Sequence, residues 1–302
     1  MKLTQWTLFI DMLGYREING SINSEEKAKE FIAFMEVNRK IFEFTDSEEK
    51  KEKYAKDEFF NLYKYYDIQS AFVSDSLIIT YHPKEVDEVL PAGVPSMHSA
   101  NALFIIAMRL QTFIFNCFLE KGMFLRGGIS NKYCYIKDNF AVGEGLIEAY
   151  LGESKYAKNP RIVLHPAVET NFELMEKIDF ISKAMYGGRS IIQKDADDLY
   201  FLDHLGYAIS VTDMDIPMIS ASAKRDPSRY ALTCKSVVDY TRRHAEAISR
   251  KFSELNEKLS HLAPESEEAK VIESVINKFI WLKNYHNSKI DKHEFLSKYQ
   301  IA

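Results

Sequence analysis

Two short apolar stretches, each of which delivers one aspartate at its end, constrain this chain more than any other feature. In the first, residues 8–10 have the composition of a buried strand, which stops at Asp11 and turns at Gly14. In the second, two apolar runs meet across Ser74-Asp75-Ser76, a pattern typical of a tight hairpin turn. A carboxylate at the mouth of a buried strand is costly unless something compensates it. The pair therefore suggests a shared divalent cation with oxygen ligands, completed by phosphates.

The hydrophobic periodicity predicts the order strand–helix–strand–strand–helix–strand–helix–strand, which is typical of a split βαβ, or ferredoxin-like, α/β core. In such a sheet the end of the first strand and the tip of the following hairpin lie side by side. That arrangement would bring Asp11 and Asp75 within reach of one or two cations. The predicted strands are residues 3–11, 67–73, 76–82, 124–130, 133–136, 161–164, 199–203 and 206–210. One predicted helix begins near residues 23–26, and a long apolar helix is capped by Ser96 or Ser99 and ends at 121–122. Two further helices are predicted to cover 143–157 and 166–176.

The C-terminal part has a different pattern, which separates an α/β core of residues 1–215 from a helical extension of residues 216–302. Apolar residues after Ser228 repeat with a helical period in two stretches, and Pro264 lies between them. This predicts a helical hairpin that packs on the core or on a partner subunit. His286 is predicted to be a buried histidine with its hydrogen bonds satisfied, or a dimer contact.

Composition excludes several classes of function. The net charge of −5 provides no global basic field for DNA or RNA, so no nucleic-acid partner is predicted. Three widely spaced cysteines without metal-ligand spacing favour a reduced, cytoplasmic location, and no secretory signal is evident. The longest apolar run, within residues 102–119, is interrupted by polar residues and is expected to be a buried helix rather than a membrane span. The Lys- and Glu-rich residues 45–58 predict a solvated loop or turn.

Further candidate residues lie close to the two aspartates in the predicted sheet. The backbone amides of residues 12–15, turning at Gly14, are placed to cradle phosphate oxygens. Arg126 precedes Gly127-Gly128, and paired glycines in a strand indicate close backbone approach to a neighbour or a ligand. The chemistry that fits is the transfer of a phosphoryl group, because two Mg²⁺ ions neutralise a triphosphate and activate an attacking hydroxyl.

Five motifs that occur in a fixed order support a more specific hypothesis. They are Phe-Ile-Asp-Met-Leu-Gly-Tyr, Val-Ser-Asp-Ser-Leu, Leu-Arg-Gly-Gly-Ile-Ser, Gly-Glu-Gly-Leu-Ile-Glu-Ala-Tyr-Leu-Gly-Glu and Asn-Pro-Arg-Ile-Val. Together with the late Trp-Leu-Lys-Asn-Tyr-His-Asn, they resemble the pyrimidine nucleotide cyclases of bacterial anti-phage Pycsar systems, distant relatives of class III adenylate and guanylate cyclases. The resemblance spans residues 7 to about 287. It implies conversion of UTP or CTP to the 3′,5′-cyclic monophosphate and pyrophosphate, with UTP preferred, in the cytoplasm and for antiviral defence.

The resemblance also implies site residues, two divalent cations (Mg²⁺ or Mn²⁺) and a head-to-tail homodimer with active sites at the subunit interface. Asp11 and Asp75 match the metal-binding aspartates, and the carbonyl of Met12 would be a further ligand. Arg126 is assigned to catalysis, and Lys132, Lys155 and Arg161 are the alternatives for the basic role. The residues assigned to the nucleotide are Leu13, Gly14, Tyr15, Tyr66, Glu148 and Arg161.

The sequence departs from the purine cyclases at three positions and leaves two other readings open. Ala71 stands where they place a lysine, and Ile147 and Leu151 stand where they place an asparagine and an arginine. Glu148 and Glu153 lie on a predicted helix, where exposed glutamates are the default. One alternative is another two-metal phosphoryl-transfer enzyme. The other is a catalytically silent cyclase fold that binds a nucleotide as a sensor.

Overall fold

The computed structural model describes residues 2–42, 61–85 and 90–302, which fall into two compact units. The first unit comprises Met1–Cys117 and Met123–His204, and the second comprises Phe118–Gly122 and Leu205–Ala302. The boundary predicted at residue 215 lies within the second unit. The loop predicted for residues 45–58 lies outside the described residues.

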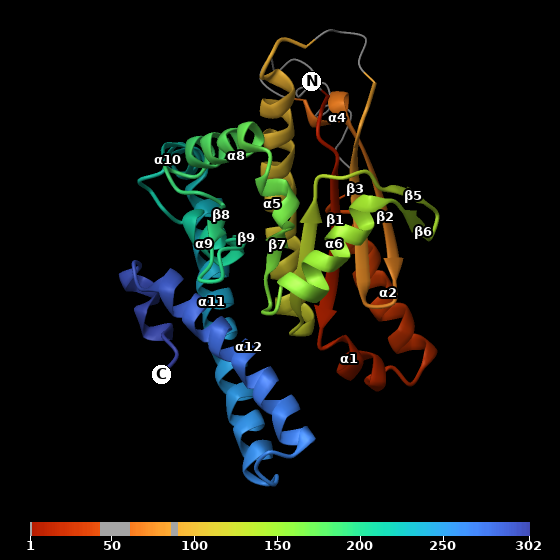
Figure 1. The fold of residues 1–302 in the computed structure, drawn as a ribbon. Helices are drawn as coiled ribbons and strands as arrows, with labels where there is room; N and C mark the ends of the chain where they lie inside the picture. Colours follow the sequence, from red (N-terminus) through yellow and green to blue (C-terminus); the bar gives the residue numbers. More distant parts are fainter. Residues whose placement is uncertain (1, 43–60, 86–89) are drawn as a thin grey trace. The chain divides into compact units, whose positions relative to one another are not determined.

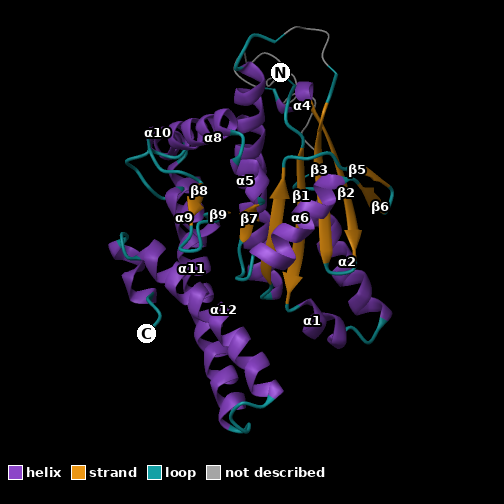
Figure 2. Ribbon diagram, in the orientation of Figure 1, coloured by secondary structure: helices purple, strands orange, loops and turns teal. Residues whose placement is uncertain are grey.

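The first unit is built on a seven-stranded sheet with the order β2-β3-β1-β4-β7-β9-β8 (Figures 1 and 2). Its first four strands pair antiparallel in the order β2-β3-β1-β4, which confirms the predicted ferredoxin-like α/β core. β7 then pairs parallel to β4. The strands are β1 (Trp6–Leu13), β2 (Tyr66–Val73), β3 (Ser76–Pro83), β4 (Phe124–Ser130), β7 (Ile162–Leu164), β8 (Ile192–Lys194) and β9 (Tyr200–Leu202).

Two long helices, α2 (Glu25–Arg39) and α5 (Val94–Lys121), lie behind one face of this sheet in Figure 1. The even-numbered residues of β1 point to that face: Leu8 and Ile10 are fully buried, and the indole of Trp6 donates to the carbonyl of Ser99 on α5. Because side chains alternate along a strand, the odd-numbered residues of β1 point to the opposite face. Two short helices, α1 (Tyr15–Ser21) and α4 (Leu62–Tyr65), precede α2 and β2 respectively.

The opposite face carries α6 (Glu144–Leu151) and a π-helix, η1 (Gly152–Tyr156), in front of the strands (Figure 1). Phe9 of β1 makes an edge-on ring contact with Tyr150 of α6, with ring centroids 5.4 Å apart. The strand predicted at residues 133–136 does not join the main sheet. It is β5 (Tyr135–Lys137), which forms a separate hairpin with β6 (Phe140–Val142). The helix predicted for 143–157 is α6 continued by the π-helix.

Two other expectations were wrong in detail. Residues 206–210, predicted as a strand, belong to helix α9 (His204–Ser210), because a short apolar run is compatible with either structure. The single helix predicted for 166–176 is two helices, α7 (Pro166–Glu169) and α8 (Phe172–Met185).

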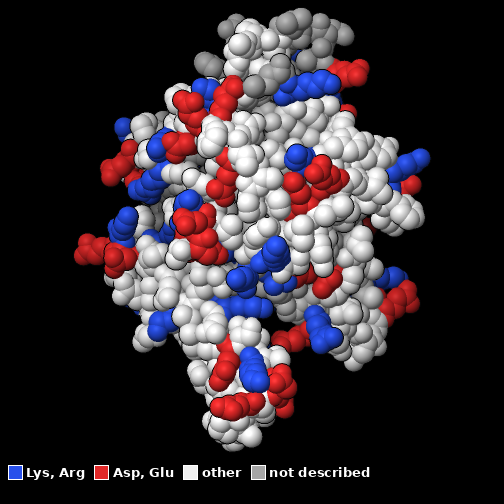
Figure 3. All heavy atoms as spheres, viewed as in Figure 1, with Lys and Arg blue, Asp and Glu red and all other residues white. Residues whose placement is uncertain are grey.

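Among the described residues, α5 is the one helix long and apolar enough to cross a membrane, judged by length and composition alone. More than half of its most apolar 18-residue window (56%) is buried inside the protein, which is typical of a core helix. On the face of the molecule in Figure 3, acidic and basic side chains of the described residues are interspersed.

The second unit contains the predicted helical hairpin, formed by α11 (Pro227–Ser260) and α12 (Glu267–Ile290). Each helix begins at a capped residue: the side chain of Asp226 accepts from the amide of Arg229, and that of Ser266 accepts from Ala269. This unit also contains α9 from Leu205 onward, α10 (Pro217–Arg225) and the 3₁₀-helix η2 (Glu294–Tyr299).

A stacked histidine pair joins the two helices of the hairpin to the C-terminal segment. His244 and His286 are buried, and their Nδ1 atoms lie 3.0 Å apart. Nε2 of His286 lies 3.0 Å from the carbonyl oxygen of Tyr299, which only accepts hydrogen bonds, so Nε2 carries the proton of neutral His286. Nδ1 of His286 is then the acceptor, and His244 donates to it. Protonation of His286 would place two donors face to face.

Burial is the main cause that lowers the pKa of His286 below its ordinary value, while the Tyr299 carbonyl opposes that shift. The unfolded chain therefore binds this proton more readily than the folded one. We expect the stability to be fully present above pH 6.5 and to fall as the pH is lowered toward the depressed pKa. Thermal unfolding of a His286→Gln variant measured between pH 7.5 and 5 should show a shallower loss than the wild type. His261→Gln, at an exposed position, should keep the wild-type slope; equal slopes in all three proteins would contradict the assignment.

Candidate active site

The two predicted aspartates lie at the same edge of the sheet, on adjacent strands. Asp11 of β1 is paired with Ser76, the first residue of β3, and Asp75 directly precedes it. The backbone N–H of Met12 donates to the carbonyl oxygen of Asp75 at 3.1 Å, which ties the end of β1 to the hairpin turn. The structure thus brings together two residues that are 64 positions apart in the sequence.

The hairpin turn that carries Asp75 has an unusual backbone. Ser74 has φ 59°, in the left-handed region that residues other than glycine rarely adopt. The register Val73↔Ser76 leaves only Ser74 and Asp75 in the loop, so the turn is as short as a hairpin allows. Strained backbone of this kind persists where the surrounding structure holds it, and it is common at functional sites.

Arg126 lies opposite Asp11 on the other neighbouring strand. The two residues are direct partners in the β1–β4 ladder, so their side chains share a face of the sheet. Nη2 of Arg126 is 3.5 Å from Oδ2 of Asp11 and forms a closer ion pair with Oε1 of Glu153. One guanidinium therefore links the first aspartate to the π-helix.

Glycines on two elements set the position of Glu153. A Cβ at Gly128 of β4 would lie 2.2 Å from the carbonyl oxygen of Ala149 and 2.7 Å from the Cα of Gly152. The helix backbone therefore rests directly on the strand, and the next residue, Glu153, is held close to Arg126. Its side chain is only 5% exposed, whereas sequence reasoning took an exposed glutamate as the default. The signal that pointed to it was the paired glycine of β4, which predicted a close approach without naming the neighbour.

The charges of this cluster are not balanced within the chain. Burial raises the pKa of Asp11; Arg126 opposes this shift and the Asp75 carboxylate adds to it. Burial likewise raises the pKa of Glu153, again opposed by Arg126 and increased by Asp11 and Asp75. Asp11 and Glu153 share one guanidinium, and the Asp75 carboxylate lies near both, so a further cation would be favoured at this edge of the sheet.

The residues present fit a divalent cation bound together with a ligand, rather than one held by protein alone. Among the described residues, no group of three or more His, Cys, Asp or Glu side chains is arranged to hold a metal ion. Asp11 and Asp75 would supply two carboxylates. Mg²⁺ is commonly bound in proteins by one or two carboxylates, with water and substrate phosphates completing the octahedron. The Met12 carbonyl as a further ligand remains a prediction.

The predicted phosphate cradle is changed by one hydrogen bond. Because the Met12 N–H donates to the carbonyl oxygen of Asp75, it is not available to a phosphate. Leu13 is paired with Phe124 in the β1–β4 ladder, and phosphate binding by Leu13, Gly14 and Tyr15 remains a prediction. Gly14 has φ 94° and lies at the turn into α1, as the sequence predicted. The ring of Tyr15 packs edge-on against Phe31, 5.7 Å between centroids.

Glu148 lies at the other end of β4 from Arg126. Its Oε2 accepts a hydrogen bond from Oγ of Ser130 at 2.5 Å and lies 3.6 Å from Nδ1 of His165. Ser130 is paired with Thr7, four residues before Asp11 on β1. Within one chain, Glu148 is therefore not brought to the two aspartates.

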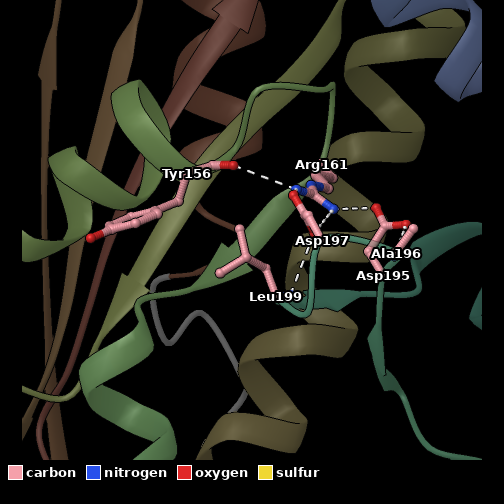
Figure 4. A network of polar contacts seen from close by, with 6 residues as sticks. All are labelled: Tyr156, Arg161, Asp195, Ala196, Asp197 and Leu199. Carbon is pink, nitrogen blue, oxygen red and sulfur yellow. Dashed lines mark hydrogen bonds and ion pairs between the residues drawn. The ribbon is translucent and has the colours of Figure 1, made fainter.

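Arg161, which was predicted to bind the nucleotide, is buried and ion-paired within the chain. Figure 4 shows its guanidinium directed at Asp195 and Asp197, with which it forms ion pairs. Nη2 also lies 3.5 Å from the carbonyl oxygen of Tyr156. These partners fix the loop before β9 to β7, so the structure gives Arg161 a structural role.

Tyr66 is likewise part of the core. It is 1% exposed, and its hydroxyl donates to the carbonyl of Thr4 at 3.0 Å. It is paired with Pro83, at the opposite end of the hairpin from Asp75. A contact between Tyr66 and a base bound at the aspartates is not supported by this position.

Comparison with known proteins gave similarity in fold only. No family model matches the chain, and no curated protein matches its sequence. The adenylyl cyclase CyaB from P. aeruginosa is similar in structure, with 13% identity, a TM-score of 0.33, and coverage of 58% of this chain and 82% of that one. The guanylyl cyclase Cya2 is similar with 11% identity, a TM-score of 0.35, and coverage of 66% and 91% respectively. At these values neither likeness establishes a family or an activity for this chain.

The contact between β4 and the π-helix can be tested by stability. We expect Gly128→Ala to destabilise the protein by about 1–3 kcal/mol, because the added methyl meets backbone atoms that cannot rotate away. Gly20→Ala, in the exposed last turn of α1, is the matched control: no atom lies within 4 Å of its Cβ, and the free energy of unfolding should be unchanged or slightly increased. Urea unfolding measures both, and equal stabilities would show that the two backbones are not in contact.

Proposed function

We propose that this protein is a nucleotide cyclase, which converts a nucleoside triphosphate into a 3′,5′-cyclic monophosphate and pyrophosphate. The observation that carries the proposal is the meeting of Asp11 and Asp75 at one sheet edge, linked by the Met12–Asp75 hydrogen bond. Strand-end aspartates on β1 and on the β2–β3 turn suit the binding of divalent cations to a triphosphate. The bound cations would neutralise phosphate charge and lower the pKa of the attacking hydroxyl.

The remaining residues of the cluster have roles that follow from their positions. Asp11 and Asp75 would hold two divalent cations, Mg²⁺ or Mn²⁺. Arg126 is within reach of the same ligand, and its buried Nε–H has no hydrogen-bond partner among the described residues. A phosphate oxygen would satisfy this donor. Arg126 would then stabilise negative charge on the triphosphate, as charge-assisted hydrogen bonds from arginine do in phosphoryl transfer.

A pyrimidine substrate, UTP in preference to CTP, is the finer part of the proposal. It is supported by the sequence motifs and by the surroundings of Ala71, where class III purine cyclases place a lysine. Ala71 is 1% exposed and lies in an apolar cluster with Ile78, Cys134 and Ile136. Ala71 therefore has no polar side chain that could recognise a purine base, in contrast to the lysine of the purine cyclases. The role in anti-phage defence rests on the same motifs.

A homodimer is supported by exposed apolar side chains on neighbouring elements of the same sheet face. They lie on β5, β6 and α6 and include Tyr135, Phe140, Val142, Ile147 and Tyr150, which are 43–78% exposed. Exposed apolar groups gathered in this way mark interaction surfaces. Residues from this region of a second copy would contact the base and complete the site.

The reaction is tested by incubating the protein separately with ATP, GTP, CTP and UTP and Mn²⁺ or Mg²⁺, with products identified by mass spectrometry. We expect cyclic UMP as the main product. Asp11→Asn and Asp75→Asn should each lower turnover on the order of 10³-fold, because each removes a carboxylate from the cation site while keeping the shape of the side chain. No cyclic product from any of the four nucleotides would reject the cyclase proposal.

The control for these variants is Asp67→Asn, on the same hairpin. Asp67 is exposed and pairs with Lys84 at the surface, so its loss should leave turnover unchanged. Nucleotide binding without product would instead favour the silent sensor. Products other than cyclic monophosphates would favour another two-metal phosphoryl-transfer enzyme.

The dimer surface is tested by Phe140→Glu, which places a charge on the most exposed apolar residue of β6. We expect the variant to sediment as a monomer in analytical ultracentrifugation and to lose cyclase activity. Phe172→Glu on α8 is the matched control, since Phe172 is 83% exposed against 78% for Phe140 but lies away from this surface. A dimer that survives Phe140→Glu and dissociates with Phe172→Glu would place the interface elsewhere.

A site shared between chains predicts complementation. Asp75→Asn inactivates the aspartate half, and Ile147→Glu, at a position that is 60% exposed, is expected to impair the half contributed by α6 of the partner. Mixing the two inactive variants should restore part of the activity, because one of the two sites in the mixed dimer is then intact. Mixtures as inactive as their components would rule out this division of the site.

A further inference from the structure

Glu153 is the less exposed of the two carboxylates that form ion pairs with Arg126. It is 5% exposed, against 19% for Asp11, and it follows the glycine whose backbone rests on β4. It lies in a π-helix, a conformation that occurs mostly as single turns, often at functional sites. A buried carboxylate needs a charged partner, and the partner here is the same guanidinium that contacts Asp11.

Two carboxylates, those of Glu153 and Asp11, compete for the guanidinium of Arg126. Its Nη2 forms a close ion pair with Glu153, whereas Asp11 is at 3.5 Å, beyond an ordinary hydrogen bond. A guanidinium drawn fully onto Asp11 would occupy the oxygen that a divalent cation needs. Glu153 holds the guanidinium back from that oxygen while keeping it at the site.

We propose that Glu153 is a positioning residue, which holds Arg126 between Asp11 and the triphosphate so that Asp11 remains available to a divalent cation. This inference rests on the proposed function, since it assigns cation binding to Asp11. Glu153 acts through Arg126 and contacts neither cation nor nucleotide. Its rigid placement comes from the contact of Gly128 with Gly152, because the strand and helix backbones leave no room for movement.

The test measures Mn²⁺ affinity by electron paramagnetic resonance in the absence of nucleotide, so the readout does not depend on turnover. Glu153→Gln keeps the size of the side chain and removes its charge. We expect its Mn²⁺ dissociation constant to rise about tenfold or more, within the range for residues that orient metal ligands, because Arg126 then pairs fully with Asp11. Glu144→Gln, at the exposed first position of α6, makes the same change in net charge and should bind like the wild type.

A double variant separates positioning from a simple change in local charge. Arg126→Gln combined with Glu153→Gln removes the competing guanidinium, so Mn²⁺ affinity should return to near the wild-type value. If Glu153 acted only through its own negative charge or through the stability of the π-helix, removal of Arg126 would not rescue it. Failure of the rescue would therefore overturn the inference.

The outcomes also separate this inference from the proposed function. A wild-type protein that binds no Mn²⁺ would reject the cation site itself. Wild-type binding with unchanged affinity in Glu153→Gln would reject only the positioning role. If thermal melting shows that Glu153→Gln does not fold, Glu153→Asp replaces it, because this variant keeps the charge but retracts the carboxylate. We expect its Mn²⁺ dissociation constant to rise, and we expect Arg126→Gln to reverse that rise. Wild-type affinity in Glu153→Asp would count against the inference.

Discussion

One guanidinium shared by two carboxylates, with a third carboxylate nearby, is the interaction on which the proposed site depends. Arg126 contacts Asp11 on one side and Glu153 on the other, and Asp75 adds its charge to both carboxylates. Such a cluster is tolerable inside a protein only when cations balance it. The protein supplies one positive charge, and the remaining imbalance is what makes the edge of the sheet suited to divalent cations. The fold provides this edge by placing β1 between β3 and β4.

The close contact of backbones explains why the cluster is rigid. Gly128 and Gly152 allow the helix to approach β4 more closely than any side chain would permit. The face of the sheet opposite α2 and α5 is therefore divided into a covered part, under α6 and the π-helix, and the edge with the aspartates. The covered part includes the contact between Phe9 and Tyr150. Packing and charge are coupled here, because the contact that buries Glu153 also positions it.

Much of the fold and half of the site could be predicted from local sequence patterns. Asp11 and Asp75 were found because each interrupts an apolar strand, and the order of strands and helices implied that their strands are neighbours. Partners supplied by distant segments were not predictable. Arg161 was predicted to bind the nucleotide, but its partners Asp195 and Asp197 come more than 30 residues later. The burial of Glu153 depends on a contact across the sheet, and residues 206–210 were too short an apolar run to distinguish strand from helix.

The three carboxylates come from distant segments, which has a consequence for how the chain folds during its synthesis. Residues 11, 75 and 153 come from separate segments, and their assembly requires β1 to pair with strands that follow it by about 70 and 120 residues. Pairings of this kind are slow to form, because long loops must close before the contacts stabilise them. During synthesis, a chain that has not extended past the π-helix contains the two aspartates without Glu153. The proposed site is thus completed only after these long-range pairings form, and a fragment that ends before the π-helix lacks Glu153.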